Sequence, residues 1–352
     1  MEIEISEALK RDDLVFIDLR SDSEHSEASI PDSINIPLFD DSEKSELGRI
    51  YRSAGENEAR RAALVIAAPK LPLLIDKINS ASKPKTPLLY CWRGGLRSLS
   101  VYQVMQLAGS PVCRLKKGYK SFRRYVNREL ASFEVQNRLL VLHGLTGVGK
   151  TLILKRLAEK GVAVIDLEGL ARHRGSVFGA IGTGGARSQK DFDALLLAEL
   201  NRHRQAPAIV IEGEGKKIGP LYLPPRLVEA MEGGLQLLLT ADLEARVDRI
   251  IDEYITEPLP EETNRAFHEG LHAISNRIGK KKSTWLAQEL EQANYRAVVS
   301  TLCLDYYDRY YRDSRPEFSH FDYTIDANNI DLAALKIEEF ITGLHRKRPA
   351  PG

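Results

Sequence analysis

Cysteine is scarce in this chain of 352 residues, which contains only Cys91, Cys113 and Cys303. None of the three stands in C-x-x-C spacing, and an odd number at wide intervals does not form a disulfide framework. An excess of charge of one sign is also absent, because 50 basic residues oppose 49 acidic ones. A polyanionic partner would therefore have to be held by a local basic patch and not by the whole surface.

Long apolar segments and targeting signals are missing as well. The most apolar stretch, residues 62–75, is interrupted by Pro69, Lys70 and Pro72, so it is unsuited to span a bilayer. The N-terminus, MEIEISEALKRDD, is acidic and lacks the apolar core of a signal peptide. We therefore expect a cytoplasmic protein with reduced cysteines and no membrane partner.

Length and composition indicate a globular protein with two domains. A chain of 352 residues is too long for one ordinary core, and its hydrophobic fraction of 43% is typical of soluble proteins. Short apolar runs alternate with helical segments along much of the chain, which predicts an α/β fold. We place the two domains at residues 1–130 and 138–352.

The strands and helices of both domains can be predicted from periodicity and from breaking residues. In the first domain the predicted elements are Leu14–Leu19, Glu56–Ile66, Leu88–Tyr90 and Ser98–Ala108. In the second domain a helix at Leu152–Lys160 accompanies apolar runs at 139–144, 162–166, 208–213 and 235–240. This alternation favours a parallel sheet covered on both faces, followed by a mostly helical C-terminal part after Ala241.

The sequence LLYCWRGGLRS at residues 88–98 places a cysteine in a glycine-containing loop between a strand and a helix. Inward-pointing backbone N–H groups and the helix N-terminus would favour the thiolate of Cys91. Glycine lets the backbone approach an anion closely, and arginine supplies forked donors to its oxygens. We therefore predict that Cys91 is catalytic and that an anion binds at Arg93, Gly94, Gly95, Arg97 and Ser98.

Two chemistries would use this loop. Cys91 and Arg97 have the C-x5-R spacing of cysteine-dependent phosphatases, although Tyr90 stands where those enzymes usually carry histidine. The upstream sequences IDLR (17–20) and HSEASIPDSINIPL (25–38) resemble the rhodanese family instead. That resemblance implies a domain that carries sulfur or selenium on the loop cysteine as a persulfide or perselenide.

The sequence GLTGVGKT at residues 144–151 matches G-x-x-x-x-G-K-[ST] in full, between an apolar strand and a helix. In this motif the backbone N–H groups cradle a diphosphate, the lysine reaches across it, and the hydroxyl binds Mg²⁺. Lys150 and Thr151 would take the last two roles. The predicted phosphate site consists of Gly144, Thr146, Gly147, Val148, Gly149, Lys150 and Thr151.

Charged residues that follow the apolar runs would surround the same phosphates. Asp166 and Glu212 each end a run, so either could take the acidic role beside the metal, with Glu214 as a third candidate. The Gly-bounded segment 166–179 would lie over the site, and two arginines after the run at 235–240 would close on it as lid arginines. The alternative for each is a surface ion pair or a polar loop. The predicted set is Asp166, Glu168, Arg172, His173, Arg174, Glu212, Glu214, Arg246 and Arg249.

A strongly basic segment lies between the two loops, because residues 114–128 contain no acid. Every fourth residue from Lys120 to Arg128 is basic, and an apolar residue recurs at the same interval from Phe122 to Leu130. This pattern predicts an amphipathic helix whose outer face is basic. Such a face favours contact with a phosphate backbone, the alternative being a solvated surface helix. The predicted contacts are Lys116, Lys117, Lys120, Arg123, Arg124 and Arg128.

Four segments together resemble the tRNA 2-selenouridine synthase family: YCWRGGLRS, GYKSFRRYV (118–126), GLTGVGKT and DLEGLARHRGSVFG. The resemblance extends over most of the chain, to about residue 240. The sequence IEGEGKKIG (211–219) departs from the family, which more often has Glu-Asp-Glu-Ser-Arg there. The resemblance implies an N-terminal rhodanese-like α/β domain and a P-loop NTPase-like parallel-sheet domain with a helical C-terminal part.

The resemblance also implies a reaction. Members of the family replace sulfur by selenium in wobble 2-thiouridine (5-methylaminomethyl type) of tRNAs for Lys, Glu and Gln, with selenophosphate as the donor. They also attach a geranyl group from geranyl diphosphate to that sulfur. The chain would thus be a transferase, both selenotransferase and tRNA geranyltransferase. It would depend on a selenophosphate-producing enzyme and hold no tight cofactor, with Mg²⁺ at Thr151 the one metal expected.

Each predicted site then receives a task. The P-loop would bind geranyl diphosphate, while Cys91 would accept selenium from selenophosphate and deliver it to C2 of the uracil ring. Arg93 and Arg97 would hold the phosphate of the donor, and the basic helix would contact the tRNA backbone. In the C-terminal part, further basic residues could extend this surface and aromatic residues could stack a base, although paired tyrosines at helical spacing are more often core and rim residues. The residues are Arg277, Lys280–Lys282, Trp285, Tyr306, Tyr307, Tyr310 and Tyr311.

Three other functions are compatible with these motifs. A C-x5-R phosphatase fused to a P-loop ATPase would release phosphate from an aryl ester through Cys91. A small-molecule kinase would turn over ATP without tRNA and would lose this activity with Lys150. A non-catalytic tRNA-binding module would need neither loop, and the presence of Cys91, Lys150 and Thr151 together argues against it.

Overall fold

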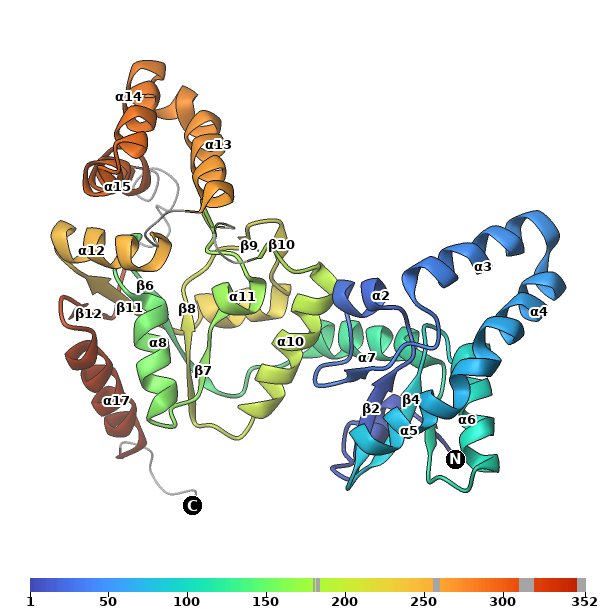
Figure 1. The fold of residues 1–352 in the computed structure, drawn as a ribbon. Coiled ribbons are helices and arrows are strands. Elements are labelled where there is room, and N and C mark those ends of the chain that lie inside the picture. The colour runs from blue at the N-terminus through green and yellow to red at the C-terminus, as the bar shows by residue number, and fades with distance from the viewer. Residues whose placement is uncertain (180, 182–183, 256–259, 310–319, 347–352) are drawn as a thin grey trace. The chain divides into compact units, whose positions relative to one another are not determined.

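The computed structural model describes residues 1–179, 181, 184–255, 260–309 and 320–346. They form two compact units, of which unit 1 comprises residues 1–130 and 188–198 and unit 2 comprises 131–187 and 199–352. Each unit is built around its own five-stranded parallel sheet, so the predicted fold class is confirmed (Figure 1). The segment 188–198, which lies in the second domain by sequence, packs with the first. Among the described residues no helix is long and apolar enough to cross a membrane.

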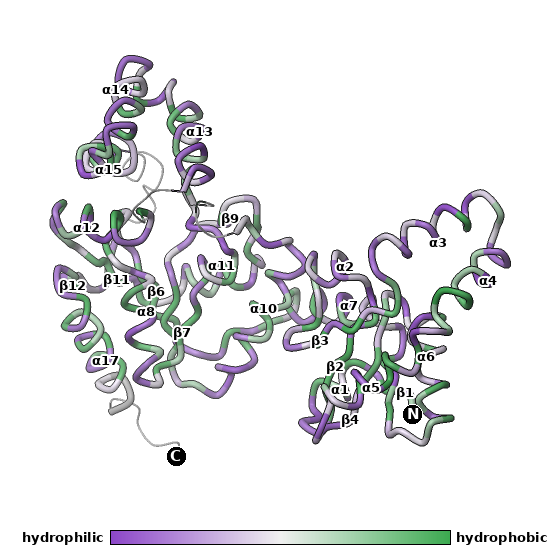
Figure 2. Tube along the Cα trace, in the orientation of Figure 1, coloured by the Kyte–Doolittle hydropathy of each residue, from purple (hydrophilic) through white to green (hydrophobic). Residues whose placement is uncertain are grey.

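The sheet of unit 1 has the strand order β1-β5-β4-β2-β3, with every neighbouring pair parallel. Its strands are β1 (Glu2–Ile3), β2 (Leu14–Asp18), β3 (Ile34–Asn35), β4 (Thr86–Tyr90) and β5 (Cys113–Leu115). Leu88, Leu89 and Tyr90 are completely buried, because β4 lies in the middle of the sheet. Figure 2 shows this central part of the unit in hydrophobic colouring.

The helices of unit 1 are α1 (Ile5–Ala8), α2 (Asp22–Glu27), α3 (Asp41–Ala54), α4 (Glu56–Ala67), the short 3₁₀ helix η1 (Ala68–Lys70), α5 (Leu71–Ser82), α6 (Leu96–Leu107) and α7 (Gly118–Ser132). Helix α3 begins with a capping box, in which Asp40 accepts from the Glu43 N–H at 2.8 Å. The basic helix starts only at Gly118, because this residue has a φ of 56° and turns the chain out of β5. Arg114, the first residue of the basic segment, lies in β5, and the helix predicted from the periodicity of Lys120 to Leu130 is confirmed as α7.

The sheet of unit 2 has the order β12-β11-β6-β8-β7 and is also parallel throughout. Its strands are β6 (Arg138–His143), β7 (Val164–Ile165), β8 (Ala208–Glu212), β11 (Leu235–Thr240) and β12 (Tyr323–Asp326), and a separate hairpin joins β9 (Lys217–Ile218) to β10 (Leu221–Tyr222). The apolar runs of the second domain are thus confirmed as strands. Strand β12 was not predicted, because it is an edge strand in which only Ile325 is buried.

The helices of unit 2 are α8 (Lys150–Glu159), α9 (Leu167–Ala171), α11 (Pro225–Glu232), α12 (Leu243–Tyr254), α13 (Glu261–Ile278), α14 (Lys280–Glu291), α15 (Tyr295–Leu302), the π-helix η2 (Cys303–Tyr307) and α17 (Ile330–Arg346), while α10 (Gln189–Arg202) has residues in both units. Helices α8 and α17 pack on the sheet around Leu140, Ile153 and Ile337, all completely buried. Burying each such side chain contributes about 1.5–3 kcal/mol.

Candidate active site

Cys91 directly follows β4, and its side chain is enclosed by the loop that leads into α6. The thiol is only 3% exposed. The Gly95 N–H donates to its Sγ at 3.3 Å, and the Ser98 hydroxyl lies 3.3 Å from the same sulfur. The structure therefore brings Cys91, Gly95 and Ser98 together at the N-terminus of α6, where the helix dipole favours negative charge on sulfur.

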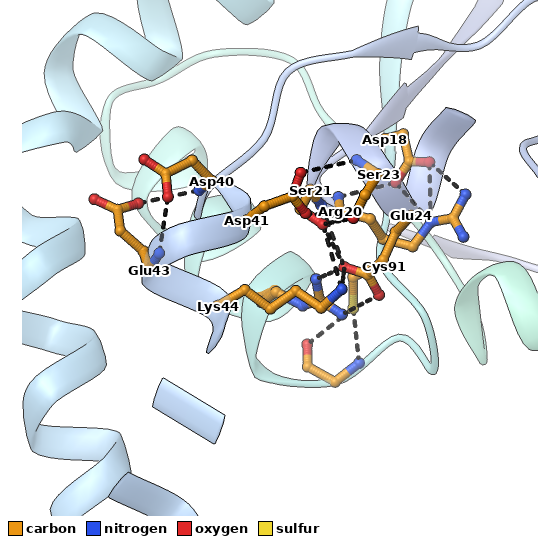
Figure 3. Close-up of polar contacts among 12 residues, drawn as sticks. Asp18, Arg20, Ser21, Ser23, Glu24, Asp40, Asp41, Glu43, Lys44 and Cys91 are labelled. Carbon is orange, nitrogen blue, oxygen red and sulfur yellow. Dashed lines mark hydrogen bonds and ion pairs between the residues drawn. The ribbon is translucent and has the colours of Figure 1, made fainter. Parts of the chain in front are cut away.

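Arg97 faces a carboxylate that the sequence did not predict. Its guanidinium donates to Glu24 at 2.8 Å and 3.4 Å, and Lys44 lies 3.5 Å from the same carboxylate. Figure 3 shows Glu24 between Lys44 and the Cys91 loop. Burial by itself raises the pKa of Glu24, but the hydrogen bond and charge of Arg97, the Ser21 N–H and Lys44 outweigh it and lower this pKa to about 2. Glu24 is thus ionised at neutral pH and neutralises Arg97.

Arg93 is the arginine of the loop that remains available to an anion. Its side chain is exposed and makes no hydrogen bond or ion pair with any other described residue. The two arginines predicted as equivalent anion ligands therefore differ, because Arg97 is tied to the loop's surroundings and Arg93 is not. Only the S-x-x-E pattern of Ser21 and Glu24 was detectable in the sequence, and it predicts a helix cap without revealing the contact with Arg97.

The side chains of the Asp-x-Arg sequence at the end of β2 pack against the Cys91 loop. Asp18 and Arg20 are both buried, and the Arg20 guanidinium binds the Asp18 carboxylate at 2.7 Å and 3.0 Å. The same guanidinium lies 4.2 Å from the centre of the Tyr119 ring and 5.9 Å from that of Trp92. Trp92, which follows Cys91, and Tyr119, at the start of α7, therefore both pack against the buried Asp18–Arg20 ion pair.

The start of α7 also touches the backbone of the Cys91 loop. The Tyr119 N–H donates to the Cys91 carbonyl at 2.9 Å, and the Lys120 N–H donates to that of Trp92 at 2.9 Å. A Cβ atom at Gly118 would lie 2.1 Å from the Cys91 carbonyl oxygen and 2.5 Å from the Gly94 nitrogen. Gly118, which was not in the predicted site, is therefore needed for the shape of the loop.

We expect Gly118→Ala to displace the Cys91 loop. The added Cβ collides with backbone atoms that cannot yield, and the φ of 56° is strained for alanine, so stability should fall by at least about 1–3 kcal/mol. Thermal unfolding and the alkylation rate of Cys91, mapped by mass spectrometry, measure the two effects. Gly109→Ala is the matched control, because Gly109 has a φ of 71° but open space around its Cβ position. Equal results for the two variants would contradict the role of Gly118.

The glycine loop of unit 2 connects β6 to α8 and surrounds a pocket. The pocket has a volume of about 340 Å³ and is lined by residues 145–152 together with Glu168, Arg174 and Arg249. Gly147 has a φ of 80°, and a Cβ atom there would lie 2.8 Å from the Arg246 carbonyl oxygen, so glycine is required. The structure thus brings the predicted phosphate residues together around one space, while Gly144 packs behind it against Leu239.

Carboxylates lie beside the lysine and the threonine of this loop. The Thr151 hydroxyl donates to Glu212 at 3.2 Å, and Lys150 Nζ lies 3.9 Å from Glu168. Burial raises the pKa of Glu212 well above its ordinary value. Burial, opposed by Lys150 and reinforced by Glu214, raises the pKa of Glu168 to about 8. Glu168 is therefore mostly protonated at neutral pH, which reduces its repulsion of a phosphate.

Only some of the acidic residues predicted to lie beside a metal ion come together in the structure. Asp166 is turned to the start of α9, where its carboxylate accepts from the Gly169 N–H at 2.7 Å. Among the described residues no group of three His, Cys, Asp or Glu side chains could hold a metal ion. The residues that fit Mg²⁺ are the Thr151 hydroxyl and Glu212 behind it, so most ligands would have to come from the bound phosphates and water.

Arg246 and Arg249 hold the glycine loop from its carbonyl side, and Arg249 also lines the pocket. Arg246 donates to the Thr146 carbonyl at 2.8 Å and pairs with Asp308 at 2.7 Å. Arg249 donates to the Val148 carbonyl at 2.8 Å. In this structure they hold the loop at its carbonyl groups, while the Val148 N–H donates to the Leu145 carbonyl at 3.1 Å within the loop.

The segment 166–179 contributes unequally to the pocket. Arg174 lines it, pairs with Glu253 at 2.7 Å and lies 4.4 Å from the centre of the Tyr254 ring. His173 instead accepts the Gly175 N–H at 3.0 Å, and burial lowers the pKa of its imidazole. Arg172 ends α9 with a φ of 50° and is exposed. Of the three predicted residues, only Arg174 faces the phosphate pocket in this structure.

A second, apolar pocket adjoins the phosphate pocket, since Thr146, Ile250 and Tyr254 line both. Its volume is about 50 Å³, and its other walls are Phe178 from the segment after α9 and side chains from α12 to η2, among them Phe267, Leu271, Leu290, Val298, Leu302, Cys303 and Tyr307. Burial raises the pKa of Cys303 to about 11, so this thiol contributes apolar surface and no thiolate. The sequence did not predict this pocket, because its residues come from helices that meet only in the tertiary structure.

Comparison with known proteins agrees with two domains that each carry one of the two loops. Residues 3–125 match the family model of the rhodanese-like domain, and residues 137–320 match that of the tRNA 2-selenouridine synthase AAA domain. The chain is 32% identical to the tRNA 2-selenouridine synthase of Sulfurovum sp. (strain NBC37-1), with 89% of each chain covered. This chain belongs to the tRNA 2-selenouridine synthase family. It is also 32% identical to the family member from Cupriavidus pinatubonensis (strain JMP 134 / LMG 1197), covering 84% of this chain and 87% of that one.

Within this tRNA 2-selenouridine synthase family member, the predicted basic contacts fall into two groups. Lys116 pairs with Glu4, Arg123 pairs with Asp193 on α10, and Arg128 pairs with Glu129. Lys117, Lys120 and Arg124 are exposed and make no ion pair or hydrogen bond with another described residue through their side chains. Lys120 and Arg124 stand at i and i+4, which places them on one side of α7, while Lys117 directly precedes the helix. The Lys120 N–H donates to the Trp92 carbonyl in the loop that carries Arg93.

The aromatic residues predicted to stack a base in this family member have different surroundings. Tyr306 and Tyr307 belong to the apolar core of the C-terminal helices, so they are not available as stacking platforms in this structure. Trp285 is 40% exposed on α14. Among the predicted basic residues nearby, Lys282 pairs with Asp305. Tyr310 and Tyr311 lie outside the described residues.

Proposed function

We propose that this protein converts wobble 2-thiouridine of tRNA to 2-selenouridine in two steps, one at each loop. Family membership supports the overall reaction. The observation that carries the two-step version is that an apolar pocket adjoins the P-loop pocket and shares three lining residues with it. A diphosphate that carries a hydrocarbon chain needs a phosphate-binding loop and an apolar pocket side by side.

In the first step the sulfur of 2-thiouridine attacks C1 of geranyl diphosphate, the C1–O bond breaks, and diphosphate leaves. The loop N–H groups and Lys150 stabilise the charge that develops on this leaving group. The hydrocarbon chain enters the apolar pocket beside Thr146. Its present volume of about 50 Å³ is below the about 300 Å³ typical of small-molecule sites, so the surrounding helices have to separate when the chain binds.

In the second step a C2–Se bond replaces the C2–S bond, and geranylthiol leaves. Selenium has the selenide oxidation level both in selenophosphate and in the product, so the exchange needs water to release phosphate but no oxidant or reductant. Cys91 acts on selenophosphate in this step, and Arg93 binds the phosphate oxygens. Arg97, held by Glu24, maintains the loop around the sulfur.

The tRNA phosphates contact the exposed side of α7. Lys120 and Arg124 lie on one face of α7, and Lys117 directly precedes the helix. The start of this helix is bonded to the Cys91 loop, which suits a substrate whose anticodon has to reach this sulfur. The acceptors are the tRNAs for Lys, Glu and Gln, and a selenophosphate-producing enzyme supplies the donor. Both assignments follow from the resemblance stated above.

Charge reversal tests the tRNA surface. We expect the double variant Lys120→Glu, Arg124→Glu to bind tRNA at least about tenfold more weakly, with a salt dependence reduced by about two counterions. Fluorescence anisotropy at several salt concentrations measures both quantities. The matched control is Arg202→Glu, Arg226→Glu, which reverses two charges that are 67% and 59% exposed elsewhere. A control variant that loses as much affinity would refute the assignment of the surface.

The reaction itself is tested with 2-thiouridine tRNA, geranyl diphosphate and selenophosphate, followed by mass analysis of the nucleosides. We expect S-geranyl-2-thiouridine with the first donor alone and 2-selenouridine with both. An unchanged tRNA in every mixture would refute the proposal. Phosphate release from an aryl ester would then favour the C-x5-R phosphatase, and ATP turnover without tRNA would favour the kinase.

A further inference from the structure

Unit 1 contains a large apolar groove that no step described so far uses. It lies between the α3–α4 hairpin and α6, and its volume is about 610 Å³. Leu47, Tyr51, Leu64, Leu71, Leu96 and Leu99 are among the side chains that line it. Tyr51, Leu64 and Leu96 are 57%, 67% and 57% exposed, which is a high fraction for large apolar residues. Figure 2 shows the hydrophobic stretches on α4 and α6.

The groove reaches the Cys91 loop through the first turn of α6. Leu96 and Arg97 line it, and the next residue, Ser98, lies 3.3 Å from Cys91 Sγ. On the other side Lys44 lines the groove and lies 3.5 Å from Glu24, which holds Arg97 (Figure 3). The reactive sulfur and the apolar surface are therefore separated by one helical turn and one ion-pair network.

The charges around the groove also restrict its occupant. Its lining includes the cations Lys44, Arg60 and Arg97. Arg60 pairs with Glu56, while Lys44 and Arg97 share the carboxylate of Glu24, so the cations outnumber these carboxylates by one. An apolar floor beside this excess positive charge fits a hydrocarbon group that is attached to a polyanion. A neutral lipid would leave the excess charge without a partner.

We propose that this groove binds the geranyl chain of S-geranyl-2-thiouridine tRNA during the selenium step. The inference rests on the proposed function, in which this chain is part of the leaving group and has to lie beside Cys91. The protein then has two apolar sites for one hydrocarbon group, beside the P-loop when the group is transferred and beside Cys91 when it is expelled. Occupation of the groove places C2 of the base within reach of the Cys91 loop.

The test uses anticodon stem-loop RNA synthesised with either S-geranyl- or S-methyl-2-thiouridine, so it does not depend on the protein's own geranylation step. Fluorescence anisotropy measures the affinity of the full chain for both. We expect the wild type to prefer the geranyl RNA by about tenfold or more. The double variant Tyr51→Ser, Leu64→Ser should reduce this preference at least fivefold and raise the KM of the geranyl RNA for selenium transfer.

Val65→Ser is the matched control, because Val65 neighbours Leu64 on α4 and is 74% exposed but does not line the groove. It should retain the wild-type preference. An unchanged preference in the Tyr51→Ser, Leu64→Ser variant would overturn the inference, and so would a change in its oligomeric state by sedimentation, which would assign the groove to a second copy. If the wild type does not geranylate tRNA but still shows the groove-dependent preference, the proposed function fails in its first step while the groove assignment stands.

Discussion

Cys91→Ser will stop the reaction at S-geranyl-2-thiouridine. A hydroxyl is a far weaker nucleophile than a thiolate, so selenium transfer should fall by at least about 10³-fold. Geranylation should proceed at the wild-type rate, because the P-loop pocket contains no part of the Cys91 loop. The measurement is the time course of both modified nucleosides by mass spectrometry.

Cys113→Ser is the control for this variant. Cys113 lies in β5, and burial raises the pKa of its thiol, so it supplies no thiolate to the reaction. It should form both nucleosides at the wild-type ratio. Selenium transfer by Cys91→Ser at more than about a tenth of the wild-type rate would show that Cys91 only lines the site.

The phosphorus product identifies how Cys91 acts. If Cys91 carries selenium as a perselenide, as the resemblance implies, the sulfur removes selenium from phosphorus with loss of two electrons from selenium, and phosphite is released. If the sulfur attacks phosphorus, selenide is set free, and hydrolysis of the thiophosphate releases phosphate. Phosphorus NMR of a single turnover separates the two products, and the redox balance of the overall reaction leads us to expect phosphate.

Lys150→Ala will abolish geranylation and, with it, selenium transfer to unmodified 2-thiouridine tRNA. The variant removes the cation that faces the leaving diphosphate, which costs about 10²–10³-fold in rate for one lost electrostatic contact. It also removes the charge that lowers the pKa of Glu168, so this pKa should rise further above about 8. Mass analysis of the nucleosides measures the loss.

Supplying S-geranyl tRNA distinguishes a lost step from a lost fold. With this substrate Lys150→Ala should transfer selenium at the wild-type rate, because Cys91 is unaffected. Lys155→Ala, an exposed position on the same helix outside the pocket, should behave as the wild type with either substrate. Geranylation by Lys150→Ala within tenfold of the wild-type rate would contradict a diphosphate site at the P-loop.

Much of the fold could be predicted because it is encoded locally. The buried strands β4, β6 and β8 are continuous apolar runs, since parallel strands in the middle of a sheet are covered on both faces. The edge strand β12 has no such run and was missed. The periodicity from Lys120 to Leu130 correctly predicted α7, which begins two residues earlier at Gly118.

The sequence by itself determined the two loops, because each is a contiguous motif in which glycine, lysine, cysteine or arginine has a fixed spacing. It also determined which face of α7 is basic. Only the tertiary structure decided which of these charges are available. Glu24 lies 73 residues from Arg97 in the chain and neutralises it, and Asp308 lies 62 residues from Arg246 and holds it behind the P-loop.

The apolar sites likewise depend on tertiary structure. Both the pocket beside the P-loop and the groove beside α6 are lined by side chains from several helices, whose individual patterns indicate only a buried face. Hydrophobic periodicity records that a residue avoids water, and it is the same for a core position and for a ligand site. Which of these residues remain exposed is set by how the helices pack, so only the folded chain distinguishes Leu64, which lines the groove, from its neighbour Val65, which does not.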